Sequence, residues 1–284
     1  MDAALTDLGR IVCSSGERAN LDEAELRAFA ANCVVALAAG GYGSRLQGIT
    51  ELEGVHKTAL RLPTGETMLE RTIRMYRDAG FQQFVALVFH RAESIIDTLG
   101  DGSSLGVQIT YSMDPEVPVG RGGAILNALA NGSIPRDKSL IVHNPDDVII
   151  RYPGSFPRDI VAAHLAGVER GLVATAVVVG GARVAYTGLA IDNGVVEEVV
   201  AYPFVPIPAH IGVTVFSPTV YGFFDELFSL TEKSDFEAVL FPRLAREQRL
   251  YTAMIPEGTW LAVNDPKALA QFVDVLNQEA GRRP

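Results

Sequence analysis

Short apolar runs alternate with amphipathic helical patterns through the first half of the chain. Between the runs, apolar positions three and four residues apart predict helices within 65–80, at 92–99 and at 122–130. Strands that alternate with helices predict an α/β fold with a Rossmann-like, doubly wound sheet, whose binding site lies at the carboxyl ends of the strands. The runs that predict its buried strands are 33–38, 84–89, 107–111 and 140–143.

The second half of the chain is richer in strand patterns separated by glycine pairs and prolines. These patterns predict mixed or antiparallel strands that lie across the first half, with a tight hairpin turn at 192–194 (Asp-Asn-Gly). The predicted strands are 173–179, 185–191, 195–200 and 211–216, and the predicted helices are 236–246 and 266–276.

No repeat or low-complexity linker divides the chain, so we expect one domain with two lobes. A helical extension is predicted at 1–31, with the apolar side chains of 4–12 on one face, and it precedes the domain at 32–284. The halves of that domain are about 32–150 and 151–284. The apolar face of the first helix packs either on its own chain or on a neighbouring subunit, so a homo-oligomer is one expectation.

Composition excludes several classes of protein. The chain has 284 residues, 48% of them hydrophobic, and only two cysteines, which argues against disulfide-stapled and disordered proteins. We expect Cys13 and Cys33 to be free thiols in a reducing compartment, the cytoplasm. A net charge of −10 argues against a broad nucleic-acid surface, and no apolar run approaches the ~18 residues of a membrane span.

A glycine-containing loop follows the first predicted buried strand. Glycines let backbone N–H groups approach an anion, and the guanidinium of Arg45 offers paired donors for phosphate oxygens, so the loop predicts a triphosphate cradle. A plain tight turn with a solvated arginine is the structural alternative. A dinucleotide fingerprint requires glycine where Leu46 stands, and a P-loop requires lysine where Ile49 stands. The cradle residues are Ala38, Ala39, Gly40, Gly41, Gly43, Ser44 and Arg45.

Two carboxylates, Asp146 and Asp147, stand at the end of the apolar strand predicted at 140–143. Carboxylates at such a place are poorly solvated unless they are paired or bind a metal, so we assign Asp146 to a metal with Asp147 as the alternate. A strand-end turn closed by aspartates is the other interpretation. The histidines lack the spacing of a zinc site.

Together these motifs resemble the sugar-1-phosphate nucleotidyltransferases, or nucleotide-sugar pyrophosphorylases. The resemblance rests on the Gly-Gly-x-Gly-Ser-Arg-Leu loop at 40–46, the His-Lys-x-x-Leu segment at 56–60 and the Gly-x-x-Met-Leu segment at 65–69. It extends to Tyr-Ser-x-Asp at 111–114, Gly-Arg-Gly-Gly-Ala-Ile at 120–125, Asn-Pro-Asp-Asp at 144–147 and landmarks up to about 277. It implies a GT-A-like sheet with a sugar-side lobe.

The resemblance also implies an activity. The family joins a nucleoside monophosphate from an NTP to a sugar-1-phosphate, with Mg²⁺ as cofactor, and releases pyrophosphate. It implies that Arg45 grips the triphosphate, that Lys57 lies near the transferred phosphate and that Asp146 binds Mg²⁺. Asp114, Gly120, Gly122 and Gly123 match the base-reading segment, which is more similar to the guanylyl than to the thymidylyl branch.

The chain departs from the family on the acceptor side. The Glu-Lys-Pro of the family falls on Ala201-Tyr202-Pro203, and the aspartate of its Trp-x-Asp falls on Ala262. The candidate acceptor residues are therefore Asp147, Gly188, Glu198, Tyr202 and His210, for a sugar phosphate or a close analogue. A catalytically silent nucleotide-sugar-binding regulatory protein is the alternative function.

Overall fold

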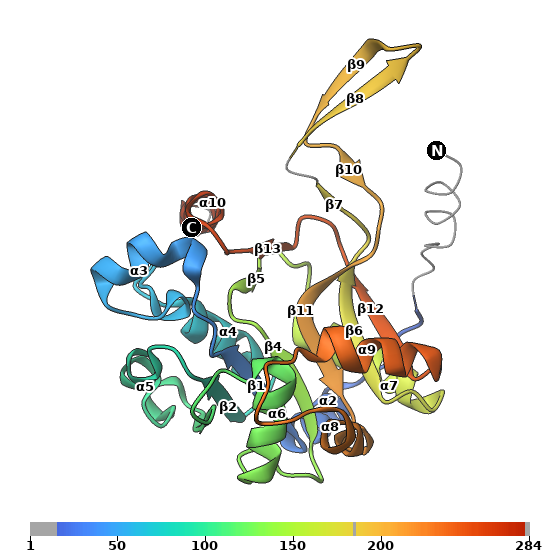
Figure 1. Cartoon of the computed structure of the whole chain (residues 1–284). Helices are drawn as coiled ribbons and strands as arrows, with labels where there is room; N and C mark the ends of the chain where they lie inside the picture. The colour runs from blue at the N-terminus through green and yellow to red at the C-terminus, as the bar shows by residue number, and fades with distance from the viewer. Residues whose placement is uncertain (1–15, 184–185, 282–284) are drawn as a thin grey trace.

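A mixed sheet of seven strands forms the centre of the computed structural model, which describes residues 16–183 and 186–281. The strand order is β12-β6-β11-β4-β1-β2-β3, and β11 alone in this sheet runs antiparallel to its neighbours. The strands are β1 (Cys33–Ala39), β2 (Gln83–Val88), β3 (Gln108–Met113), β4 (Ser139–His143), β6 (Ala174–Val179), β11 (Ala209–Phe216) and β12 (Leu250–Ile255). The predicted doubly wound α/β fold with a mixed sheet is confirmed (Figure 1).

Helices cover both faces of this sheet, which explains why its strands are almost wholly apolar. Alternate residues of β1 belong to different cores: Val35 and Leu37 pack on one face, Val34 and Ala36 on the other. The first face is covered by α2 (Glu23–Ala31), α4 (Met68–Asp78), α5 (Ala92–Leu99) and α7 (Phe156–Glu169), and the second by α6 (Gly120–Ala130), α8 (Tyr221–Leu227) and α9 (Phe236–Arg246).

The described part of the N-terminal extension packs on the sheet domain. Leu21 and Leu26 are buried in the first core, and the Ala19 amide donates a hydrogen bond to the Ala162 carbonyl of α7. A capping box between Asp22 and Glu25 starts α2. The helical pattern predicted at 4–12 lies outside the described residues, as does Cys13. Cys33 is buried and free, and burial raises the pKa of its thiol.

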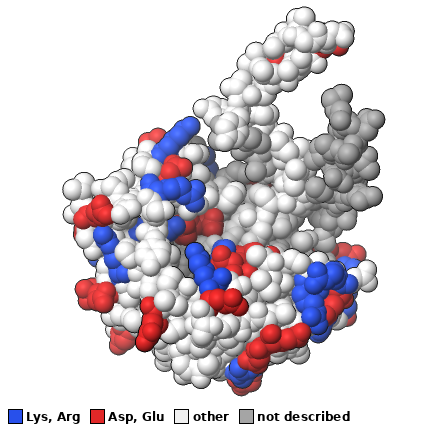
Figure 2. Space-filling model, in the orientation of Figure 1, with Lys and Arg blue, Asp and Glu red and all other residues white. Residues whose placement is uncertain are grey.

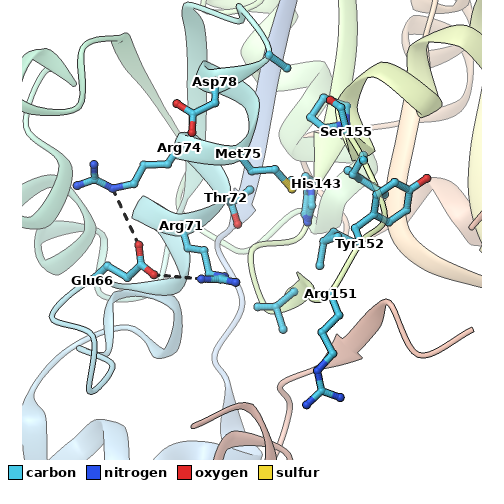
Figure 3. A pocket seen from close by; sticks show the side chains of 16 residues that line it. Glu66, Arg71, Thr72, Arg74, Met75, Asp78, His143, Arg151, Tyr152 and Ser155 are labelled. Carbon is cyan, nitrogen blue, oxygen red and sulfur yellow. Dashed lines mark hydrogen bonds and ion pairs between the residues drawn. The ribbon is translucent and has the colours of Figure 1, made fainter. Parts of the chain in front are cut away.

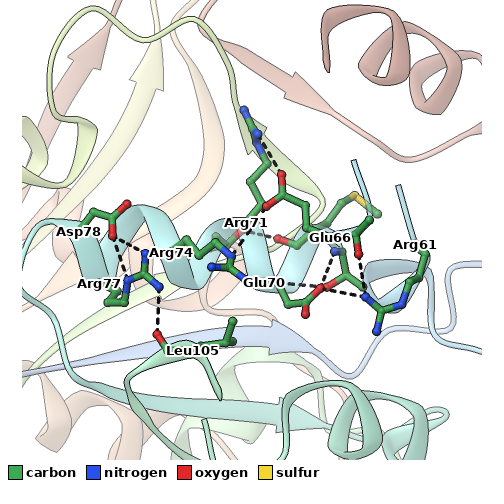
Figure 4. A network of polar contacts seen from close by, with 12 residues as sticks. Arg61, Glu66, Glu70, Arg71, Arg74, Arg77, Asp78 and Leu105 are labelled. Carbon is green, nitrogen blue, oxygen red and sulfur yellow. Dashed lines mark hydrogen bonds and ion pairs between the residues drawn. The ribbon is translucent and has the colours of Figure 1, made fainter. Parts of the chain in front are cut away.

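A smaller third core packs the C-terminal helix against residues that follow the glycine loop in sequence, Leu62 and Met68 among them. It lies under α10 (Pro266–Gly281) and a two-stranded ladder of β5 (Asp147–Ile149) and β13 (Trp260–Ala262). Arg71 of α4 pairs with Glu279 of α10 at 3.0 Å, within a network of ion pairs along α4 (Figure 4). These contacts fix the segment before α10, which borders the candidate site described below. The short helix α3 (Gln47–Glu53) follows the glycine loop.

A two-stranded hairpin, β8 (Thr187–Asp192) and β9 (Val195–Ala201), projects from the body of the protein (Figure 1). Its two-residue turn has Asn193 at φ 46° and Gly194 at φ 82°, so the predicted turn is confirmed. The hairpin stands away from the sheet and does not lie across the first half as expected. Its base is the short ladder of β7 (Ala182–Arg183) and β10 (Phe204–Val205). None of the described helices is both long and apolar enough to cross a membrane.

Candidate functional site

A cavity of about 430 Å³ opens at the carboxyl ends of β1, β2, β3 and β4, where a doubly wound sheet binds its ligands. Residues from five regions of the sequence meet there, within 38–57, at 87, within 114–124, within 144–146 and within 233–235. Its lining is Ala38, Gly40, Gly41, Tyr42, Arg45, His56, Lys57, Leu87, Asp114, Pro118, Gly120, Arg121, Ala124, Asn144, Asp146, Lys233 and Asp235. All three predicted catalytic residues are among them.

The glycine loop leaves β1 and turns over the side chain of Lys57. Gly43 has φ 61°, and a Cβ atom there would lie 3.1 Å from Cδ of Lys57, so this position requires glycine. The next residues form a short 3₁₀ helix, Ser44–Leu46, which buries Leu46 and presents Arg45 to the cavity. None of the described residues pairs with the guanidinium of Arg45, which leaves its donors for an anion.

His56 holds this loop in place. Its Nε2–H donates to the carbonyl of Gly41 at 2.8 Å, and its Nδ1 accepts from Thr58. Burial lowers the pKa of His56 to about 4, so the ring is neutral at pH 7. The ring therefore has the tautomer that ties the loop to the segment carrying Lys57.

The Lys57 ammonium meets the Asp146 carboxylate directly, in a half-enclosed position where both side chains are at most 15% exposed. The Asn264 side-chain oxygen lies 3.3 Å from the same ammonium nitrogen. A carboxylate oxygen and an amide oxygen thus meet the Lys57 ammonium near the end of β4. Such a donor set fits a hard divalent ion, because Mg²⁺ is usually held by one or two carboxylates and substrate phosphates. Among the described residues, no group of three or more His, Cys, Asp or Glu side chains is placed so that it could hold a metal ion by itself.

Asp147 lies beside Asp146 but is fixed by other donors. Its carboxylate accepts from Trp260 Nε1 and from Asn144 Nδ2, both at 3.0 Å. Burial, together with the charge of Asp146, raises the pKa of Asp147 to about 7. The backbone of Gly212, at φ 74°, passes so close that a Cβ atom there would lie 2.1 Å from Asp147 Oδ2.

The other end of the cavity is more apolar. Leu87 on β2 and Ala124 on α6 lie near Asp114, whose pKa is raised by burial and whose carboxylate accepts from the Val119 amide at 3.1 Å. Since β3 and β4 are three strand spacings apart, the strand ends that precede Asp114 and Asp146 are separated by roughly 14 Å across the sheet edge.

The N-terminus of α6 is already occupied by other parts of the chain. The Arg121 amide donates to Asp235 Oδ1 and the Gly122 amide to the Ser234 carbonyl, both at 2.9 Å. Gly122 and Gly123 do not line the cavity: Cβ atoms there would lie 2.1 Å from Phe228 and 2.6 Å from Val119. The structure thus gives these two glycines a packing reason, and Gly120 alone of the three borders the cavity.

A second cavity of about 390 Å³ adjoins the first on the Asp147 side. His210 borders it, with Nε2–H donating to the Val213 carbonyl and a pKa lowered to about 4 by burial. Arg121, which pairs with Glu237 at 2.8 Å, borders both cavities. The lining is Arg121, Asn144, Asp146, Asp147, His210, Gly212, Glu237 and Asn264.

Several predicted residues are not brought to either cavity. Gly188 and Glu198 lie on the projecting hairpin, and Tyr202 lies at its base with Lys267 Nζ 5.1 Å from its ring. Ala39 is buried beneath the loop, while Gly43 and Ser44 shape the loop without lining the cavity. Conversely, the motifs at 56–60, 120–125 and 144–147 pointed to the regions of His56, Arg121 and Asn144, but nothing local in the sequence indicated Asn264.

A larger cavity of about 580 Å³ lies apart from these groups, between α4 and the start of α7 (Figure 3). Among its charged groups, Arg71 pairs with Glu66 at 3.3 Å, and the Arg151 guanidinium donates to the side-chain oxygen of Gln278. At its floor, His143 Nδ1 accepts from the Tyr76 hydroxyl and Nε2–H donates to the Asp147 carbonyl, both at 2.9 Å. His143 thereby supports the turn that presents the two aspartates.

Comparisons with known proteins agree with this geometry. A curated relative, the UTP–glucose-1-phosphate uridylyltransferase of Synechocystis sp., is 26% identical over 238 residues, which are 79% of this chain and 58% of the relative. The chain thus spans less than two thirds of that relative's length.

Two solved structures share the fold. One is a putative glucose-1-phosphate thymidylyltransferase from Bacillus anthracis, solved in complex with a sucrose (TM-score 0.64, 17% identity, 87% of this chain and 95% of that chain). The other is the inositol-1-phosphate CTP transferase from T. maritima (TM-score 0.60, 14% identity, 87% and 95%). The family model for nucleotidyl transferases matches residues 35–279, which include the glycine loop, Lys57 and both aspartates, and the chain therefore belongs to the nucleotidyl transferase family.

Proposed function

We propose that the protein is an enzyme that transfers a nucleoside monophosphate from an NTP to a sugar-1-phosphate or a close analogue, giving an NDP-sugar and pyrophosphate. The observation that carries the proposal is the meeting of Arg45, Lys57 and Asp146 in one cavity at the sheet edge. An unpaired guanidinium, an ammonium and a carboxylate at one place suit a polyphosphate and its counter-cation. The names of the relatives, all sugar- or inositol-phosphate nucleotidyltransferases, support the same reaction class.

The reaction requires the protein to position the reactants and to neutralise their charge, and it requires no general base. The acceptor phosphate oxygen is already an anion, so in-line attack on the α-phosphate needs no proton removal. Arg45 would hold the triphosphate, and Lys57 would offset the charge that develops at the transferred phosphate. Asp146 would hold Mg²⁺ with Asp147 close by, and the ion would supply a further positive charge on the phosphates.

The second cavity is the proposed acceptor site. It adjoins the first at Asp146, as an in-line attack requires, and its hydrogen-bonding groups suit a polyol phosphate. Guanylyl transfer is part of the proposal on sequence grounds alone, through the 111–114 segment and Asp114. Nucleic acid is not among the proposed partners, since the chain carries 34 acidic and 24 basic residues.

A silent nucleotide-sugar-binding protein is the second candidate. It is favoured by Ala262, which pairs with Asp147 across the β5–β13 ladder and brings no carboxylate there. A protein of this kind would bind NTP or NDP-sugar but release no pyrophosphate.

Pyrophosphate release from a panel of nucleoside triphosphates and sugar-1-phosphates with Mg²⁺ tests the two candidates. The transferase predicts release with at least one pair, and a loss of 30-fold or more in Arg45→Ala and Lys57→Ala, which corresponds to ~2 kcal/mol or more of barrier. Arg61→Ala is the matched control, because Arg61 is exposed and outside both cavities. Tight NDP-sugar binding without release for any pair would reject the transferase.

A further inference from the structure

The second cavity contains a carboxylate whose hydrogen bonding is incomplete. Glu237 on α9 pairs with Arg121 at 2.8 Å through Oε1, whereas its Oε2 is buried and accepts no hydrogen bond. Among the described residues, it is the one buried side-chain oxygen or nitrogen in this state. Burial raises the pKa of Glu237, because water no longer solvates its charge. A buried polar atom of this kind requires an explanation, and a bound ligand is one.

His210 places a second hydrogen-bond acceptor beside this carboxylate. Its Nε2 lies 3.0 Å from the Val213 carbonyl and from the Thr214 hydroxyl. Because the carbonyl can only accept, Nε2 carries the proton and Nδ1 has a lone pair. Burial lowers the pKa of His210 to about 4, so Nδ1 stays unprotonated at pH 7. Nδ1 lies 3.9 Å from Glu237 Oε1, which is too far for a hydrogen bond between them.

The charge of the cavity indicates which kind of donor would complete it. The carboxylates on its lining are those of Asp146, Asp147 and Glu237, and Arg121 is the one Lys or Arg among the lining residues. The Arg121 guanidinium is shared, because its Nε also donates to Asp235 at 3.1 Å. The space-filling view shows acidic groups in the hollow beneath the projecting hairpin, with basic groups beside them (Figure 2). The lining therefore favours a positively charged donor.

We propose that the second cavity takes an acceptor phosphate that carries a primary ammonium, and that Glu237 and His210 bind this ammonium. An ammonium has three N–H donors, so it can bond to the carboxylate and to the His210 Nδ1 together, and its charge offsets that of Glu237. A hydroxyl has one O–H and can donate to only one of the two. The acceptor class is thus an amino sugar phosphate or another amine-bearing phosphomonoester. The inference rests on the proposed function, which makes this cavity the acceptor site.

Calorimetric titration tests the proposal, with Mg²⁺ and a triphosphate analogue that cannot react already bound. The first set of probes is glucose-1-phosphate and its analogues in which an amine replaces the hydroxyl at carbon 2, 3, 4 or 6. The second set is phosphoethanolamine and its hydroxyl counterpart, 2-hydroxyethyl phosphate. At least one amine should bind about tenfold more tightly than its hydroxyl counterpart, as a charge-assisted hydrogen bond predicts. If no amine binds more tightly than its counterpart, the proposal is overturned.

Two variants assign the preference to these side chains. Glu237→Gln keeps the shape of the side chain and removes its charge, and His210→Gln keeps a donor for the Val213 carbonyl but removes Nδ1. In both, the dissociation constant of the hydroxyl probe divided by that of the amine should fall to about one. Glu66→Gln is the matched control and should keep the wild-type ratio. The Glu66 side chain has the same 21% exposure, pairs with Arg71 at 3.3 Å and lies outside both cavities.

The ratio separates a direct contact from a general loss of structure. A substitution that only loosens the cavity weakens both probes and leaves the ratio unchanged, so a wild-type ratio in Glu237→Gln would overturn the proposal. Titration detects binding even in a catalytically silent protein, and failure of the transferase proposal therefore leaves this test intact. Pyrophosphate release with neutral sugar phosphates, together with no preference for any amine, would support the transferase and reject the ammonium site.

Discussion

Replacing His56 by alanine should weaken triphosphate binding although His56 need not touch the ligand. The side chain is 1% exposed, and its Nε2–H bond to the Gly41 carbonyl is the contact that ties the glycine loop to the Lys57 segment. Without this bond the loop would sample other conformations, and binding would have to order it again.

The size of the effect follows from that bond. A net hydrogen bond contributes ~1 kcal/mol, so the dissociation constant for triphosphate should rise about fivefold. Stability should fall by more, roughly 2–4 kcal/mol, because a buried ring is also removed and leaves a cavity. The experiment must therefore measure the dissociation constant and the free energy of unfolding separately.

His164→Ala provides the matched control. His164 is 2% exposed, its pKa is also lowered to about 4 by burial, and both ring nitrogens are hydrogen-bonded, to Thr175 and Ser217. It lies on α7, outside the 430 Å³ cavity at the sheet edge. Calorimetric titration with triphosphate, alongside urea unfolding, should show similar destabilisation in both variants but weaker binding only in His56→Ala. Equal dissociation constants in the two variants would refute the positioning role.

Three further outcomes are expected. Gly212→Ala should abolish pyrophosphate release, because φ 74° and the approach to Asp147 Oδ2 leave no room for a Cβ, and circular dichroism should show whether the fold persists. Gly122→Ala should lower the free energy of unfolding by ~1–3 kcal/mol through overpacking on Phe228 while leaving triphosphate affinity unchanged in titrations; a large loss of affinity would return this glycine to the nucleotide site. The four histidines at 56, 143, 164 and 210 have pKa values lowered by burial to about 4, so the unfolded chain takes up protons first as pH falls through 6.5, at a cost of roughly 1 kcal/mol of stability per histidine. Asp147, whose pKa is raised to about 7, contributes a smaller change of the opposite sign. Urea unfolding at pH 7.5 and 5.5 should therefore show a net loss of stability, and a flat profile would contradict the neutral burial of the histidines.

Local pattern was enough to predict most of the sheet and the helices next to it. The structure has α5 and α9 at the predicted bounds, because periodic apolar positions and polar flanks marked both. The helix α7 was missed since it is buried on most of its circumference, so its sequence lacks a polar stripe, and Pro157 and Gly167 resemble breakers. The edge strand β12 was missed as well, between a helix and a turn.

The candidate site likewise contains residues that local sequence pattern predicts and residues that it does not. The glycine loop, Lys57 and the aspartates follow strands whose order the α/β rule predicts, so their convergence was foreseeable. Asn264 reaches Lys57 across 207 positions, and no local pattern carries such a contact. Glu198 and Gly188 illustrate the converse: the sequence indicates a hairpin around its Asp-Asn-Gly turn, but not the direction in which that hairpin points.

The single antiparallel strand of the central sheet has a consequence for how this chain tolerates changes in length. Val179 at the end of β6 pairs with Ala209 at the start of β11, so the chain leaves the sheet and re-enters it at adjacent positions. Everything between them, the hairpin included, is an excursion whose ends the sheet already holds together, and changing its length costs little closure entropy. Insertions and deletions within that excursion can therefore be accommodated while the residues that line the two cavities keep their positions.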